Sequence, residues 1–212
     1  MFTVTVLIAP MIAVIGGWVT WTLSEYCLHR WAMHELMGRG LISREHLAHH
    51  TEPNTTRFGL LTCLQWTGIA LIGAALSALV VLAIGPLGWV FGAGWALGYA
   101  WYEIFHARSH LRPPLRLLRN SDLRLRRHHF HHHFGHPMSN HGVTIALWDR
   151  VFGTFEQSEV IRVPQGKAPT WLLGDDGAVH PDYAEHYVVV GDRSSRTARR
   201  DALAAARAAI AV

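Results

Sequence analysis

Two long stretches of the chain are apolar, and the charged residues lie between and after them. Residues 1–24 and 58–102 contain no charged side chain and no histidine. A helix needs about 20 apolar residues to cross the hydrocarbon layer of a membrane, so the first stretch can form one span and the second can form two. Gly85-Pro86 offers a turn in the middle of the second stretch. The pattern predicts spans over residues 2–23, 59–83 and 87–104.

The basic residues indicate how these spans are oriented. Every lysine and arginine lies between the first and second spans or after the third. Lysine and arginine concentrate in cytoplasmic loops, so we expect the N-terminus outside and residues 25–57 and 105–212 in the cytoplasm. Residues 1–155 are then a membrane-embedded domain, and residues 156–212 are a cytoplasmic C-terminal tail.

Composition also favours a membrane protein with a single such domain. Half of the 212 residues are hydrophobic and only 16% are charged, which is unusual for a soluble protein. The two cysteines, Cys27 and Cys63, give no disulfide framework. Seven arginines crowd residues 108–127 without a nucleic-acid recognition motif, so we expect no nucleic-acid partner. Beside a span, such arginines attract anionic lipid headgroups, each contributing about 1 kcal/mol.

Ten of the 16 histidines gather in four short clusters next to the predicted spans. The clusters are His29/His34, His46/His49/His50, His106/His110 and His129/His132/His133. Neutral imidazole is a strong ligand for iron, copper, zinc and nickel, and one ion uses about four to six such nitrogens. Ten clustered rings therefore indicate two ions. In the predicted topology all four clusters emerge on the cytoplasmic face, where they can form one shared site.

The spacing within the clusters favours helices that present their histidines on one face. The second and fourth clusters occupy positions i, i+3 and i+4, and His106 and His110 are four residues apart. Such positions share one face of an α-helix. His29 and His34 are five residues apart, about 140° around an ideal α-helix. This pair therefore either serves two different ions or lies on a distorted helix.

Further polar residues are candidates for the layer around the metal ligands. Metal-bound imidazoles usually donate their second N–H group to a carboxylate or a carbonyl. Glu103 lies at the end of a predicted span, where a carboxylate without a partner would cost free energy. The candidates are Glu25, Glu45, Glu103, Asp122, His128, His136, Asn140, His141 and Asp149. His180 and His186 are expected to be ordinary surface residues of the polar tail.

The four clusters, in this order around these apolar segments, resemble the membrane-bound fatty acid hydroxylase and sterol desaturase superfamily. The matching elements are His29-x-x-x-x-His34, His46-x-x-His49-His50, His106-x-x-x-His110 and His129-x-x-His132-His133. Two later segments, Asn140–Thr144 and Trp148–Thr154, resemble the closing part of the family's sequences. The resemblance covers residues 25–155.

This resemblance implies an all-α fold, an integral membrane helical bundle whose cytoplasmic helical cap holds a histidine-rich dimetal site. It implies that residues 1–155 are a hydroxylase domain and that all ten clustered histidines bind two iron ions. The family uses dioxygen as co-substrate, and electrons from a separate donor protein, to hydroxylate or desaturate a membrane lipid. No catalytic side chain beyond the dimetal centre is expected. Zinc has no redox chemistry, yet it binds imidazole tightly enough to fill such a site in a purified sample.

Two alternatives differ in substrate or in class. Carotenoid hydroxylases share the overall plan, but their third histidine pair is one residue wider than His106/His110. We therefore expect a fatty-acyl substrate, with a carotenoid or sterol hydroxylase of the same superfamily as the alternative. A metal-ion transporter or store would also bind metal, but transport should place ligands or charges within the spans. Residues 58–102 contain none.

Overall fold

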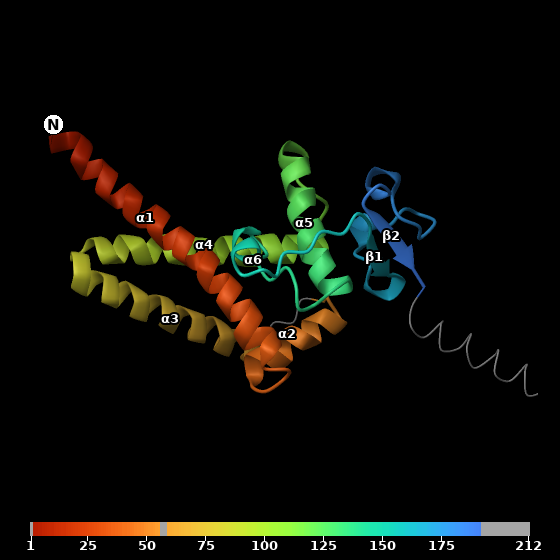
Figure 1. Ribbon diagram of the computed structural model, residues 1–212, viewed down its shortest axis with the longest axis horizontal. Helices are drawn as coiled ribbons and strands as arrows, with labels where there is room; N and C mark the ends of the chain where they lie inside the picture. The colour runs from red at the N-terminus through yellow and green to blue at the C-terminus, as the bar shows by residue number, and fades with distance from the viewer. Residues whose placement is uncertain (1, 56–58, 192–212) are drawn as a thin grey trace, which may run out of the picture.

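Most of the chain is helical in the computed structural model, which describes residues 2–55 and 59–191 (Figure 1). This confirms the predicted helical fold class. The long helices are α1 (Phe2–Cys27), α3 (Leu60–Ile84) and α4 (Leu87–Leu111), and α1 continues into a π-helix (Leu28–Glu35). Three shorter helices lie towards one end of this bundle: α2 (Leu41–Thr51), α5 (Arg119–Phe134) and α6 (Leu147–Val151).

Helix α4 is the central member of the three long helices. It packs against α1 and against α3 (Figure 1). Gly94 lies against the backbone of Val14 in α1, and Gly88 lies against the backbone of Val81 in α3, so that a side chain at either glycine would clash. Small residues let helix backbones approach closely in this way. The glycines of α4 therefore explain how one helix can pack tightly on two neighbours.

Two segments are long and apolar enough to cross a membrane. They are Ile8–Glu35, which runs through α1 into the π-helix, and Leu60–Ile84. Helix α4 has the same 25-residue length as α3, but its glycines, aromatic residues and Glu103 make it less hydrophobic. Its place between α1 and α3 lowers the apolar area that it must present to lipid. A third span over residues 87–104 stays a prediction.

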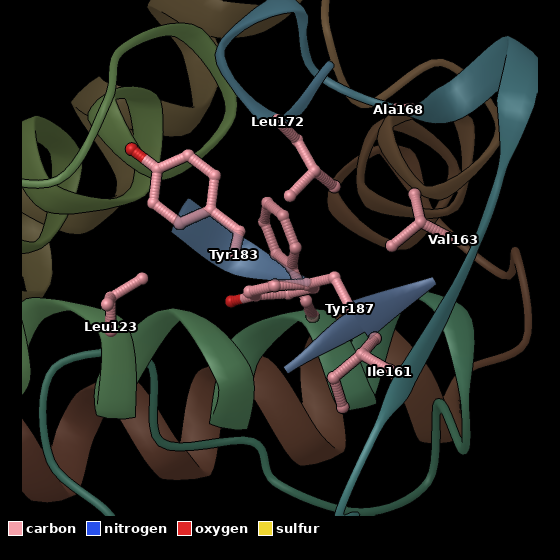
Figure 2. Packing of buried hydrophobic residues seen from close by; sticks show 8 residues of the cluster. Leu123, Ile161, Val163, Ala168, Leu172, Tyr183 and Tyr187 are labelled. Carbon is pink, nitrogen blue, oxygen red and sulfur yellow. The ribbon is translucent and has the colours of Figure 1, made fainter. Parts of the chain in front are cut away.

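The described part of the expected tail packs onto α5. Strands β1 (Ile161–Pro164) and β2 (Tyr187–Val190) pair in parallel, with Ile161 opposite Tyr187, and they are the exception to an all-helical fold. Figure 2 shows most of the core that they share with α5: Leu123, Phe130, Ile161, Val163, Ala168, Leu172, Tyr183 and Tyr187. Burying a large apolar side chain contributes about 1.5–3 kcal/mol, so this core fixes α5 in place. Residues 192–212 of the predicted tail lie outside the described residues.

Candidate metal centre

The ten clustered histidines converge in two groups of five. The first group consists of His29, His34, His46, His50 and His132. The second group consists of His49, His106, His110, His129 and His133. Within each group, one ring nitrogen from every residue lies within 4.8 Å of the others. Residues from four separate helical segments thus meet at two adjacent points.

Helices α2 and α5 divide their histidines between the two groups. Helix α2 contributes His46 and His50, one turn apart, to the first group and His49 to the second. Helix α5 reverses the division, with one histidine in the first group and two, again one turn apart, in the second. Helix α4 serves only the second group, through a pair four residues apart. The i, i+3, i+4 spacing therefore lets a single helix face both groups.

The π-helix explains the wider spacing of His29 and His34. Hydrogen bonds in a π-helix run between residues five apart, so residues at this spacing lie on the same side of the helix. Both rings belong to the first group. The sequence left open whether His29 and His34 serve two different ions or lie on a distorted helix. In the structure they lie on a distorted helix.

Four rings of the first group form a square, and the fifth ring caps it. The square runs through His29, His46, His50 and His132. Neighbouring rings in this order have centroids 4.5–4.8 Å apart, whereas His46 and His132 at opposite corners are 6.3 Å apart. His34 lies 4.6–5.1 Å from all four. The five rings of the first group therefore form a square pyramid with His34 as its cap.

The second group has the same geometry. Its square runs through His49, His106, His129 and His133. Neighbouring centroids are 4.4–4.8 Å apart, and His110 lies 4.6–5.3 Å from all four. One ring from each square, His50 and His133, stack in parallel with centroids 4.1 Å apart and join the two groups.

The distances between ring nitrogens fit metal coordination better than hydrogen bonding. Nε2 of His46 lies 2.8–3.0 Å from Nε2 of His29, His34 and His50. A neutral ring nitrogen carries either one proton or one lone pair, so it cannot satisfy three partners. Metal–imidazole bonds of about 2.1 Å place neighbouring ligand nitrogens about 3 Å apart. The groups are therefore shaped for ions.

Burial keeps these imidazoles neutral, which is the form that binds metal. Desolvation lowers the pKa of His49 to about 4 and is the largest cause lowering the pKa of His50 to about 2. The pKa values of His129 and His132 are lowered for the same reason. Both ring nitrogens of His133 lack a hydrogen-bond partner among the described residues. A buried polar ring without a partner is costly, and a bound ion removes that cost.

A loop between α5 and α6 holds two rings of the first group through backbone carbonyls. Nδ1 of His29 donates to the carbonyl of His141 at 2.5 Å, and Nδ1 of His132 donates to the carbonyl of Ser139 at 2.7 Å. These hydrogen bonds place the second proton of each ring on the outside and leave Nε2 facing the group. The sequence could not identify these acceptors, because a backbone carbonyl belongs to every residue type.

Asp149, one of the predicted outer carboxylates, holds this loop and not a ring of the two groups. It is fully buried and accepts hydrogen bonds from the backbone N–H groups of His141 and Gly142 at 2.7 and 2.9 Å. Nε2 of His128, another predicted outer residue, lies 2.9 Å from its second oxygen. Burial alone would raise the pKa of Asp149, but the hydrogen bonds from His128, Thr154 and Gly142 bring it below its ordinary value. Asp149 is therefore a charged anchor for the loop.

Glu25 and Asn140 fix the same loop at two further points. The carboxylate of Glu25 accepts the backbone N–H groups of Val143 and Thr144 at 2.6 and 2.8 Å. Asn140 has a left-handed backbone, with φ of 55°, and its side chain exchanges hydrogen bonds with the backbone of Glu156 at 2.8 and 2.9 Å. Three of the predicted outer residues thus act on the loop that orients the ligands.

His141 lies behind the first group. Its ring is fully buried, and neither ring nitrogen has a hydrogen-bond partner within residues 2–55 and 59–191. Its centroid lies 5.5–5.6 Å from the rings of His29, His34 and His132, farther than the members of the group lie from their neighbours. Since one of these neighbours is the capping His34, the ring of His141 packs against the capped side of the group.

The other four predicted outer residues lie in different surroundings. Glu45 and Glu103 line a cavity beside the centre. Asp122 pairs with the buried Arg126 at 2.5 Å, and His136 is exposed in an ion pair with a glutamate. In the part of the chain that the structure describes, none of the four forms a hydrogen bond with one of the ten rings. Arg126 also donates to backbone carbonyls at the end of α4, including that of Arg112 at 2.7 Å.

The cavity gives access to the second group. It has a volume of about 210 Å³ and lies between α2, α3 and α4. Residues from all three helices line it, among them His46, His49, Gln65, Trp66, Glu103 and His106. Three rings of the second group and one ring of the first reach its wall. A molecule in this cavity would therefore lie directly beside the histidines.

Comparison with known sequences identifies the family. A sequence model described as fatty acid hydroxylase matches residues 14–154, which include all ten clustered histidines. The chain belongs to the fatty acid hydroxylase family. Family membership and the two histidine groups together indicate a metal site.

Several characterised family members are similar to this chain. A dihydroceramide fatty acyl 2-hydroxylase of Arabidopsis thaliana is 32% identical over 143 residues, which are 65% of this chain and 58% of the relative. The human fatty acid 2-hydroxylase is 32% identical over 65% of this chain and 38% of its own length. The solved hydroxylase domain of Scs7p is 29% identical, with a TM-score of 0.54 over 71% of this chain and 57% of that one. The chain thus spans little more than half of the plant relative and of the solved chain.

Proposed function

We propose that this protein is a membrane-bound oxygenase that uses dioxygen to hydroxylate a fatty-acyl chain of a membrane lipid. The observation that carries this proposal is the pair of five-histidine groups, each arranged as a square pyramid, beside a cavity at the end of apolar helices. The names of the relatives support carbon 2 of the acyl chain as the position that is hydroxylated.

In this proposal the ten histidines hold two iron ions, one in each group. Iron would supply the redox chemistry that activates dioxygen. Zinc could bind the same histidines, but it has no redox chemistry. The protein's own part is to hold the rings neutral and oriented. Asp149 and Glu25 fix the loop whose carbonyls orient His29 and His132.

The reaction requires electrons that this chain does not supply. Inserting one oxygen atom into a C–H bond consumes dioxygen, two electrons and two protons, and it yields the alcohol and one water molecule. We assign the electrons to a separate donor protein that approaches from the cytoplasmic side. Residues 1–155 are then the hydroxylase domain, with α1, α3 and α4 as three spans, the N-terminus outside and the histidines on the cytoplasmic face.

The test is a product assay with labelled oxygen. Cells that express the wild-type chain should form a 2-hydroxyacyl lipid that carries ¹⁸O when grown under ¹⁸O₂, as measured by mass spectrometry. The His132→Ala variant should lose this product and bind less metal, because His132 is a corner of the first square. The His180→Ala variant, which changes an exposed residue, should keep both. If no lipid gains ¹⁸O while the metal content of the cytoplasm changes, the transporter alternative replaces this proposal.

A further inference from the structure

The two histidine groups differ in what holds the outer side of their rings. In the first group, backbone carbonyls accept the outer N–H groups of His29 and His132. In the second group, Nδ1 of three buried rings has no hydrogen-bond partner among the described residues, and these rings are His110, His129 and His133. A ring without such a hydrogen bond keeps its orientation only through the atoms that pack against it. The second group therefore needs packing partners where the first has hydrogen bonds.

Phe130 packs against the cap of the second group. It is fully buried in α5, and its ring stacks on that of His110 with centroids 5.4 Å apart and an interplanar angle of 25°. The same phenyl ring lies 6.0 Å from the ring of Trp171 and 5.9 Å from that of Tyr187. Aromatic rings attract one another when their centroids are about 4.5–7 Å apart. A series of ring contacts therefore leads from the C-terminal segment to the capping histidine.

Trp171 also contacts the backbone beside this cap. Its indole N–H donates to the carbonyl of Ser109 at 3.1 Å, one residue before His110. The guanidinium of the buried Arg126 lies over the Trp171 ring, 5.0 Å from its centroid, and donates to the same carbonyl at 3.1 Å. The last carbonyls of a helix have no partner within the helix. These two donors therefore fix the final turn of α4, which carries the capping ring.

The segment that carries Trp171 is also fastened to the end of α2. Nζ of Lys167 donates to the carbonyl of His50 at 2.8 Å. The side-chain amide of Asn54 donates to the carbonyls of Lys167 and Ala168 at 3.1 and 3.2 Å. The segment is therefore tied to α2 and α4, two of the helices that supply the second group.

We propose that Trp171 is a positioning residue for the second histidine group. It acts through Phe130 and through the last turn of α4, and it keeps the ring of His110 turned towards the other four rings. This inference rests on the proposed metal centre, because the orientation of the rings matters only if the group binds an ion. Trp171 lies outside the residues 14–154 that match the family model, so part of the expected tail belongs to the metal centre.

The metal affinity of the second group tests this inference. The full chain in detergent would be loaded with Zn²⁺ and titrated with a chelator, in the His29→Ala background, which leaves the second group intact. Trp171→Ala should weaken Zn²⁺ binding about 10–100-fold, as is typical when a group that orients a ligand is lost. Trp171→Phe, which keeps an aromatic ring against Phe130, should recover part of this loss. In the His129→Ala background, which leaves the first group intact, Trp171→Ala should change the affinity less than about twofold.

A control variant and a spectrum separate positioning from a general loss of stability. Val189→Ala removes apolar volume at the edge of the same core, so it should lower the melting temperature and leave the Zn²⁺ affinity unchanged. With Co²⁺, whose visible absorption depends on ligand geometry, Trp171→Ala should alter the bands of the second group and Val189→Ala should not. Unchanged affinity in Trp171→Ala, equal losses in both backgrounds, or an equal loss in Val189→Ala would overturn the inference. If the wild-type chain bound no Zn²⁺, the proposed metal centre would fall, and this inference with it.

Discussion

Replacing Asp149 by asparagine should loosen the first histidine group and spare the second. One oxygen of Asp149 accepts from the N–H of His141 and the hydroxyl of Thr154, and the other accepts from the N–H of Gly142 and from His128. Asparagine keeps a single acceptor oxygen. Whichever way the amide is oriented, two donors lose their acceptor. At about 1–3 kcal/mol for each such loss, the cost is about 2–6 kcal/mol.

The lost hydrogen bonds destabilise the loop between α5 and α6, which orients rings of the first group. The carbonyls of Ser139 and His141 hold the rings of His132 and His29. Loss of a group that orients a ligand typically lowers metal affinity about 10–100-fold. Among the described residues, the rings of the second group form no hydrogen bond with this loop. In the Asp149→Asn variant, the metal affinity of the second group should therefore stay within about twofold of its wild-type value.

Competition with a chelator can measure the metal affinity of each histidine group separately. The His129→Ala background leaves the first group intact, and the His29→Ala background leaves the second. Adding Asp149→Asn should weaken metal binding about 10–100-fold in the first background and have no effect in the second. Glu156→Gln is the matched control, because within the described residues its carboxylate forms hydrogen bonds only with His131 and His136. Equal losses in both backgrounds, or no loss in either, would refute the reasoning, and circular dichroism would exclude unfolding as the cause.

Three further predictions concern topology, pH and packing. Single cysteines at Pro86 and Asn120, in a chain without native cysteines, should react with impermeant reagents from opposite sides of the membrane; labelling from one side would contradict the three spans. Burial holds the pKa of His49 near 4 and that of His50 near 2, against 6.5 for the ordinary side chain. The unfolded chain thus binds more protons below pH 6.5, so the free energy of unfolding of the metal-free protein should fall between pH 6.5 and 4, by roughly 1.4 kcal/mol per histidine and pH unit. Its melting temperature should fall with it, and a constant melting temperature would contradict this. Gly94→Leu should push α4 away from α1 and lower the melting temperature in detergent, whereas Gly59→Ala, at a position with open space around it, should change it little.

The helical spacing of the histidines was the part of the centre that the sequence could predict. Positions i, i+3 and i+4 share a helix face in any context, so the contributions of α2, α4 and α5 followed from sequence distance alone. The π-helix at His29 and His34 did not follow, because its hydrogen bonding depends on the packing around it. The division of His46 and His49 between two groups also depends on how the helices cross, which no local pattern records.

The outer layer of the centre was predicted by residue and not by role. Glu25 and Asp149 were singled out for their closeness to the clusters and Asn140 for its place in a family-like segment, and all three hold a loop whose carbonyls hold the rings. Backbone acceptors such as the carbonyl of Ser139 have no sequence signature. The parallel pairing of β1 with β2 was missed because the two strands are four residues long and are separated by more than 20 residues of loops and short 3₁₀ turns.

The π-helix also bears on how histidine patterns are compared between proteins. His29/His34 and His106/His110 play the same geometric part, each pair supplying one corner and the cap of a square pyramid, although one pair is a residue longer. A single inserted residue can therefore be absorbed by a change of helix type with the ligand geometry intact. Search patterns that demand a fixed gap would separate proteins that build the same centre. Substrate preference should consequently be sought in the cavity walls between α2, α3 and α4, where an insertion or a substitution alters what fits.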